Sequence, residues 1–149
     1  MTTQKLYVCD TVSIISYFNE IFGVGQILSK QAYGIIDDTF KNNYSLNRLS
    51  IPAMVFIEIF EKWLTYETIV NQFHSEVFVP VSESETIEIR EIDKEVISVA
   101  MDLNYNLSDH DAHDKLIVSS AIILNAPIIT TDTEIINFAD LSGQISVIM

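Results

Sequence analysis

A chain of 149 residues that is 48% hydrophobic, with four glycines and three prolines, is expected to fold as a single domain over residues 1–149 and not to be disordered. Its formal net charge of −13, from 21 Asp and Glu against 8 Lys and Arg, argues against binding nucleic acid through a broadly basic surface. The same charge is compatible with divalent cations or with a basic protein partner.

The sequence also gives expectations about location. No apolar run approaches the roughly 20 residues of a membrane span, so we expect no membrane association. The N-terminal segment MTTQKLYVCD lacks the long apolar core of a signal peptide. The single cysteine, Cys9, lies in an apolar stretch, which indicates a buried, reduced thiol and a cytoplasmic protein.

Strand-like and helix-like segments alternate through the first half of the chain, as judged by the spacing of apolar residues. In order, we predict a strand at residues 5–9, helices at 11–22 and about 27–40, a strand at 48–51 and one long helix at 53–74. This long helix is expected to bury five apolar residues, which are Val55, Phe56, Ile59, Phe60 and Trp63.

The alternation continues in the second half, after an irregular stretch at residues 76–85. In order, we predict a strand at 86–90, helices at 93–103 and 109–124, a strand at 128–131, a helix at 133–139 and a strand at 145–148. This pattern predicts an α/β fold with a central, mainly parallel sheet flanked by helices on both faces. In such sheets, ligands bind beyond the carboxyl ends of the strands.

Four acidic residues lie in apolar surroundings: Asp10, Glu58, Asp114 and Asp132. Asp10 and Asp132 follow predicted strands, Glu58 lies within VFIEIF, and Asp114 precedes LIV. A buried carboxylate is unfavourable unless it is paired or binds a metal ion. Carboxylate oxygens favour Mg²⁺ or Mn²⁺ over zinc, and such a cluster suits metal-assisted phosphodiester hydrolysis.

Each acid also has a simpler structural explanation. Asp10 and Asp132 could serve only as helix N-caps, and Glu58 could pair with Lys62 on an exposed helix face. Asp111 could simply favour the start of a helix. We favour a shared site because the predicted topology brings these acids towards one place.

Four segments together resemble the PIN domain family of nucleases, which includes the VapC toxins of bacterial toxin–antitoxin pairs. These segments stand in the family's order and at its usual separations: YVCDTVSIISYF, VFIEIFE, DAHDKLIVSSA and ITTD. The resemblance implies a PIN-like, three-layer fold and a metal-dependent endoribonuclease, the toxin of a type II toxin–antitoxin pair. It also implies Mg²⁺ or Mn²⁺ as cofactor, RNA as substrate, a homodimer, and a basic antitoxin as partner.

The family's catalytic, metal-binding acids correspond to four residues of this chain: Asp10, Glu58, Asp114 and Asp132. Asp111 would assist as a further metal ligand, and Thr11 and Thr131 match positions whose hydroxyls support the acids. Three positions differ from the residues common in the family: Val12 for a small polar residue, His113 for an aromatic residue and Lys115 for arginine.

Alternatives to an active toxin remain open. The run HDAHD suggests a metal phosphohydrolase built on an HD dipeptide, but that family is all-helical and the predicted strands argue against it; we interpret His110 and His113 as an exposed helix start. A catalytically weak or inactive PIN-like domain that only binds a protein, or a housekeeping nuclease, would fit the same pattern. The aromatic residues at helical spacing are interpreted as core, with a dimer face as the alternative.

Overall fold

The computed structural model describes residues 3–103 and 112–149. Its sheet contains five strands: β1 (Lys5–Cys9), β2 (Asn47–Pro52), β3 (Ile87–Arg90), β4 (Ile128–Ile129) and β5 (Val147–Ile148). The strand order is β3-β2-β1-β4-β5, and every neighbouring pair is parallel. The predicted α/β fold with a mainly parallel sheet is therefore confirmed.

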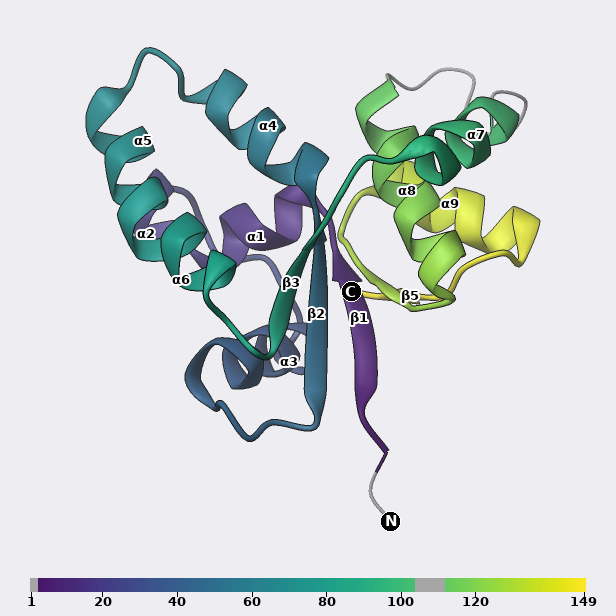
Figure 1. The fold of residues 1–149 in the computed structure, drawn as a ribbon, viewed down its shortest axis with the longest axis horizontal. Coiled ribbons are helices and arrows are strands. Elements are labelled where there is room, and N and C mark those ends of the chain that lie inside the picture. Colours follow the sequence, from purple (N-terminus) through teal and green to yellow (C-terminus); the bar gives the residue numbers. More distant parts are fainter. Residues whose placement is uncertain (1–2, 104–111) are drawn as a thin grey trace.

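Helices cover both faces of this sheet, which gives three layers (Figure 1). On one side lie α1 (Thr11–Tyr17), α2 (Asn19–Phe22), α3 (Lys30–Lys41), α4 (Ala53–Lys62), α5 (Glu67–Phe73), the π-helical turn η1 (His74–Phe78) and α6 (Val79–Ser82). On the other side lie α7 (Lys94–Asp102), α8 (Ala112–Leu124) and α9 (Thr133–Ser142). Within the described residues, no helix has the length and apolar character needed to cross a membrane.

The core lies along the central strands. Val8 and Cys9 of β1 and both residues of β4, Ile128 and Ile129, are fully buried. A parallel sheet covered on both faces needs such continuous apolar runs, because both sides of each strand face helices. Cys9 is a free thiol in this core, as expected, and its burial raises the pKa of the thiol far above the usual range.

The prediction of a single long helix at 53–74 is wrong. Helix α4 ends at Lys62 and α5 begins at Glu67, with a turn closed by the Tyr66 N–H donating to the Trp63 carbonyl at 2.8 Å. Trp63 is buried against Phe22, with ring centroids 4.5 Å apart, and this contact holds the chain where it reverses. Helical spacing cannot reveal the break, because the residues on both sides of it keep that spacing.

The segment after the break also differs from expectation. The chain stays helical from η1 through α6, where an irregular stretch at 76–85 was predicted. Pro80 lies in the first turn of α6, directly after the π-helical turn η1. Of the five residues expected to be buried, Val55, Ile59 and Trp63 are buried, Phe56 is half-buried and Phe60 is 53% exposed.

Other predicted boundaries shift by a few residues. The predicted helix at 11–22 is divided at Phe18 into α1 and α2, and α3 begins at Lys30 because the Ser29 side chain caps it by accepting from the Ala32 N–H. Helix α9 continues to Ser142 and ends at Gly143, whose φ of 66° is the left-handed conformation that glycine adopts readily. The predicted start of the helix at 109 lies outside the described residues.

Candidate active site

A polar pocket of about 520 Å³ lies at the carboxyl edge of the sheet, where β1 and β4 end side by side. Its lining consists of Asp10, Thr11, Val12, Ile15, Glu58, Glu61, Lys62, His113, Asp114 and Asp132. The structure thus brings the four predicted acids to the wall of one pocket. They come from the end of β1, the middle of α4, the first turn of α8 and the start of α9.

Asp10 is the deepest of these acids, with 3% of its surface exposed. Its Oδ1 accepts from the Ser13 N–H at 2.9 Å and from the Ser13 hydroxyl at 2.7 Å, and its Oδ2 accepts from the Thr130 hydroxyl. Burial raises the pKa of Asp10 to about 6, because the hydrogen bonds offset the cost of desolvating the charge only in part. Asp10 therefore caps α1, as the simpler explanation required, and also presents a buried carboxyl to the pocket.

Glu58 is half-buried on α4 and is held by two neighbours. Its Oε1 accepts from the Thr11 hydroxyl at 2.6 Å, and its Oε2 lies 3.6 Å from His113 Nδ1. The residues that the structure describes contain no ion pair between Glu58 and Lys62. The carboxylate is thus turned towards the pocket, not towards a surface lysine.

The other two acids come from the starts of two helices. Asp114 lies in the first turn of α8 and is half-buried. Asp132 caps α9, its side chain accepting from the Glu134 N–H at 2.9 Å, and it also lines the pocket. Asp111 and His110 lie outside the described residues, so their predicted roles remain predictions.

Hydroxyl groups support the acids, but only partly as expected. Thr11 contacts Glu58, whereas the described contacts at Asp10 come from Thr130 and Ser13. The Thr130 Oγ1 also accepts from the Asp132 N–H at 2.9 Å, so one buried hydroxyl links two of the acids. The sequence contains one indication of Thr130, because this residue continues the buried run of β4. The supporting role of Thr131 remains a prediction.

The donor set suits a hard divalent cation better than a soft one. The polar groups that line the pocket are carboxylates, one hydroxyl, one lysine and one imidazole, and oxygen ligands of this kind favour Mg²⁺ or Mn²⁺. Across residues 3–103 and 112–149, no three His, Cys, Asp or Glu side chains already form a compact cluster that would hold an ion. The chemistry of the pocket fits such an ion, and the acids line the site without forming a closed cage.

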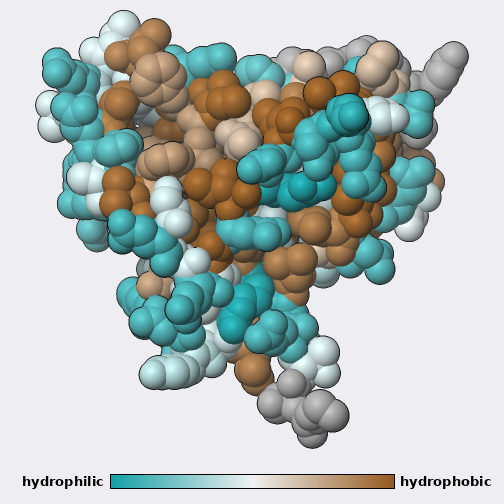
Figure 2. All heavy atoms as spheres, in the orientation of Figure 1, coloured by the Kyte–Doolittle hydropathy of each residue, from teal (hydrophilic) through white to brown (hydrophobic). Residues whose placement is uncertain are grey.

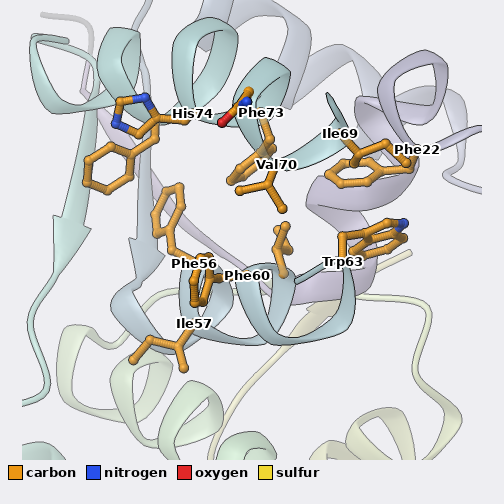
Figure 3. Close-up of a pocket in the computed structure, with 12 residues that line it drawn as sticks. Phe22, Phe56, Ile57, Phe60, Trp63, Ile69, Val70, Phe73 and His74 are labelled. Atoms are coloured by element: carbon orange, nitrogen blue, oxygen red, sulfur yellow. The ribbon is translucent and has the colours of Figure 1, made fainter. Parts of the chain in front are cut away.

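A second, apolar pocket of about 440 Å³ lies between α4 and the α5–η1 segment. Figure 3 shows Phe22 and Trp63 at one end, His74 at the other, and Phe56 and Phe60 rising from α4. Hydrophobic residues gather over this upper part of the molecule in Figure 2. The prediction that the aromatic residues lie in the core is therefore confirmed for Phe22 and Trp63, which are buried, and is wrong for Phe60.

No protein-family model and no curated protein matches this sequence. Solved structures share its fold. The chain is similar to one in VapBC2 from Rickettsia felis bound to a promoter DNA fragment, with a TM-score of 0.65, 18% identity, and 95% of this chain and 96% of that chain covered. It is also similar to one in VapBC-1 from nontypeable Haemophilus influenzae, with a TM-score of 0.61, 15% identity, and 95% and 96% covered.

A third similar structure is FitAcB from Neisseria gonorrhoeae, with a TM-score of 0.63, 13% identity, and 96% of each chain covered. Another is described as a toxin–antitoxin complex from Klebsiella pneumoniae, with a TM-score of 0.62, 15% identity, and 96% of each chain covered. The fold is that of a PIN-like α/β domain. The chain shares the fold of chains in these structures over nearly its whole length, which confirms the PIN-like architecture expected from the sequence.

Proposed function

We propose that this protein is an endoribonuclease that depends on Mg²⁺ or Mn²⁺ and acts as the toxin of a toxin–antitoxin pair. The observation that carries the proposal is the pocket at the carboxyl edge of the sheet, lined by Asp10, Glu58, Asp114 and Asp132. The fold shared with chains of toxin–antitoxin complexes supports the assignment as a toxin.

The four acids of the pocket would all be ligands of the divalent ion. Asp10, fixed through both carboxyl oxygens, and Glu58, fixed through Thr11, would bind the divalent ion together with Asp114 and Asp132. When bound, such an ion lowers the pKa of water and stabilises the oxygens that carry charge during phosphodiester hydrolysis. Because Asp10 is costly to ionise when buried, a cation beside it would favour its charged form.

A basic antitoxin is the partner that the surface favours. The net charge of −13 attracts a basic chain, and the apolar pocket lies against α4, the helix that also carries Glu58 into the acidic pocket. A segment with apolar residues for one pocket and basic residues for the other would cover both sides of α4. This arrangement would block access of RNA to the acids.

Metal dependence is the first test. Purified protein is expected to cleave a structured RNA in the presence of Mg²⁺ or Mn²⁺, to stop when EDTA is added and to resume when the metal is restored in excess. Cleavage that continues undiminished in EDTA would contradict the proposal. Failure to cleave with either ion, together with no calorimetric binding of Mn²⁺, would instead indicate a PIN-like module that only binds a protein.

A further inference from the structure

We propose that Lys62 binds a phosphate group of the RNA substrate at the acidic pocket, an inference that rests on the proposed nuclease function. The pocket presents an electrostatic problem to any RNA. Its lining includes five carboxylates: Asp10, Glu58, Glu61, Asp114 and Asp132. Each phosphate of RNA adds a further negative charge, so a fixed cation at the pocket would favour binding.

Lys62 is the only lysine or arginine among the described residues that line this pocket. Lys115, which follows Asp114 in sequence, lines a different pocket between α7 and α8. His113 is the other basic group at the acidic pocket, and it faces Glu58. Lys62 is therefore the side chain placed to receive a phosphate oxygen beside the acids.

The contacts of Lys62 leave its charge available. It lies one turn after Glu58 on α4, a spacing at which a salt bridge is common, yet the described residues show no carboxylate paired with it. Its Nζ instead lies 4.8 Å from the centroid of the Trp63 ring. A cation–π contact at an exposed site is weak, so the ammonium can leave the ring for a phosphate at little cost.

The aromatic base beneath Lys62 is rigid. Trp63 is 7% exposed and packs against Phe22 with ring centroids 4.5 Å apart. The indole therefore gives the ammonium of Lys62 a defined position beside the pocket, and the four-carbon stem lets the ammonium move from there over several ångströms. The charge thus rests on a rigid surface when no RNA is bound and can move to a phosphate when RNA arrives.

A purely structural role for Lys62 makes a different prediction. A lysine in the last turn of a helix interacts favourably with the helix dipole, and its removal would lower stability without changing how RNA binding responds to salt. A phosphate contact would instead contribute to the salt dependence, because each such contact releases counterions from the RNA. The salt dependence therefore separates the two roles.

The test compares Lys62→Gln and Lys62→Arg with Lys5→Gln, which alters an exposed lysine at the opposite, amino end of β1. KM for RNA cleavage is measured from 50 to 200 mM KCl at saturating Mn²⁺, and thermal unfolding is followed for each protein. For Lys62→Gln we expect KM to rise roughly tenfold, and the slope of log(1/KM) against log[KCl] to become shallower by about 0.7, the value for one phosphate contact to a single strand. Lys62→Arg, which keeps the charge, and Lys5→Gln should retain the wild-type slope.

Two results would overturn the inference. A wild-type slope in Lys62→Gln would show that Lys62 makes no phosphate contact, and an equal change in Lys5→Gln would show only a loss of overall charge. Both results leave the nuclease assignment intact, because the wild-type protein still cleaves RNA. A wild-type protein that cleaves no RNA with either metal overturns the proposed function, and the role of Lys62 with it.

Discussion

Asp10→Asn is expected to lower metal-dependent RNA cleavage by at least about a hundredfold, a loss typical of removing a charged group that stabilises the transition state. The amide keeps one carbonyl oxygen, which can still accept from the Ser13 N–H and cap α1. It removes the negative charge that a divalent ion would bind. This variant should therefore keep its fold and lose its activity. RNA cleavage measures the activity, and circular dichroism measures the fold.

The same substitution should make the protein more stable at neutral pH when metal is chelated. The pKa of Asp10 in the folded protein, about 6, lies above its ordinary value near 4, so folding favours the protonated form. Protonated Asp10 therefore contributes fully to the stability of the folded protein below pH 4, and this contribution is lost as the pH rises through about 6. At pH 7 the loss lowers the free energy of unfolding by about 3 kcal/mol. Asparagine does not ionise, so the free energy of unfolding of Asp10→Asn should not fall in this way as the pH rises.

Urea denaturation in EDTA at pH 4 and at pH 7 measures this effect as the difference between variant and wild type, in which the other acids cancel. Asp140→Asn, which changes an exposed acid on α9, is the matched control and should show neither effect. Full cleavage activity in Asp10→Asn would remove Asp10 from the site. A stability difference that does not depend on pH would show that Asp10 is not buried as a charge.

Thr130→Val is expected to lower cleavage by about 10- to 100-fold, the range found when a group that orients a metal ligand is removed. Valine has nearly the same shape as threonine but lacks the hydroxyl, so Oδ2 of Asp10 loses its donor and the Asp132 N–H loses its acceptor. The variant should also lose about 1–3 kcal/mol of stability, because Thr130 is fully buried. Thr130→Ser, which keeps the hydroxyl, should recover most of the activity.

Thr131→Val is the matched comparison, because the family resemblance points to Thr131 and the observed hydrogen bonds point to Thr130. Calorimetric titration with Mn²⁺ supplies a readout that a general loss of stability would not change in a protein that remains folded. We expect weaker binding of Mn²⁺ in Thr130→Val than in Thr131→Val. Weaker binding of Mn²⁺ in Thr131→Val than in Thr130→Val would show that Thr131, and not Thr130, supports the acids.

Local sequence patterns determined much of the fold. The continuous apolar runs of β1 and β4 predicted buried strands, and the alternation of strands and helices predicted a parallel sheet, because each crossover between parallel strands needs a helix. The same patterns placed Asp10 and Asp132 immediately after strands. In a parallel sheet, this position is sufficient to bring the two acids to the same edge.

Tertiary contacts decided the rest. At the turn between α4 and α5, Trp63 packs against Phe22, about 40 residues earlier in the chain. Likewise, Thr130 supports Asp10 across 120 residues of sequence, and only the pairing of β1 with β4 brings the two together. Local spacing shows which residues are apolar but not which distant groups meet. The sequence therefore predicted the acids, and the resemblance predicted Thr11, whereas only the structure identified Ser13 and Thr130 as the hydroxyls at Asp10.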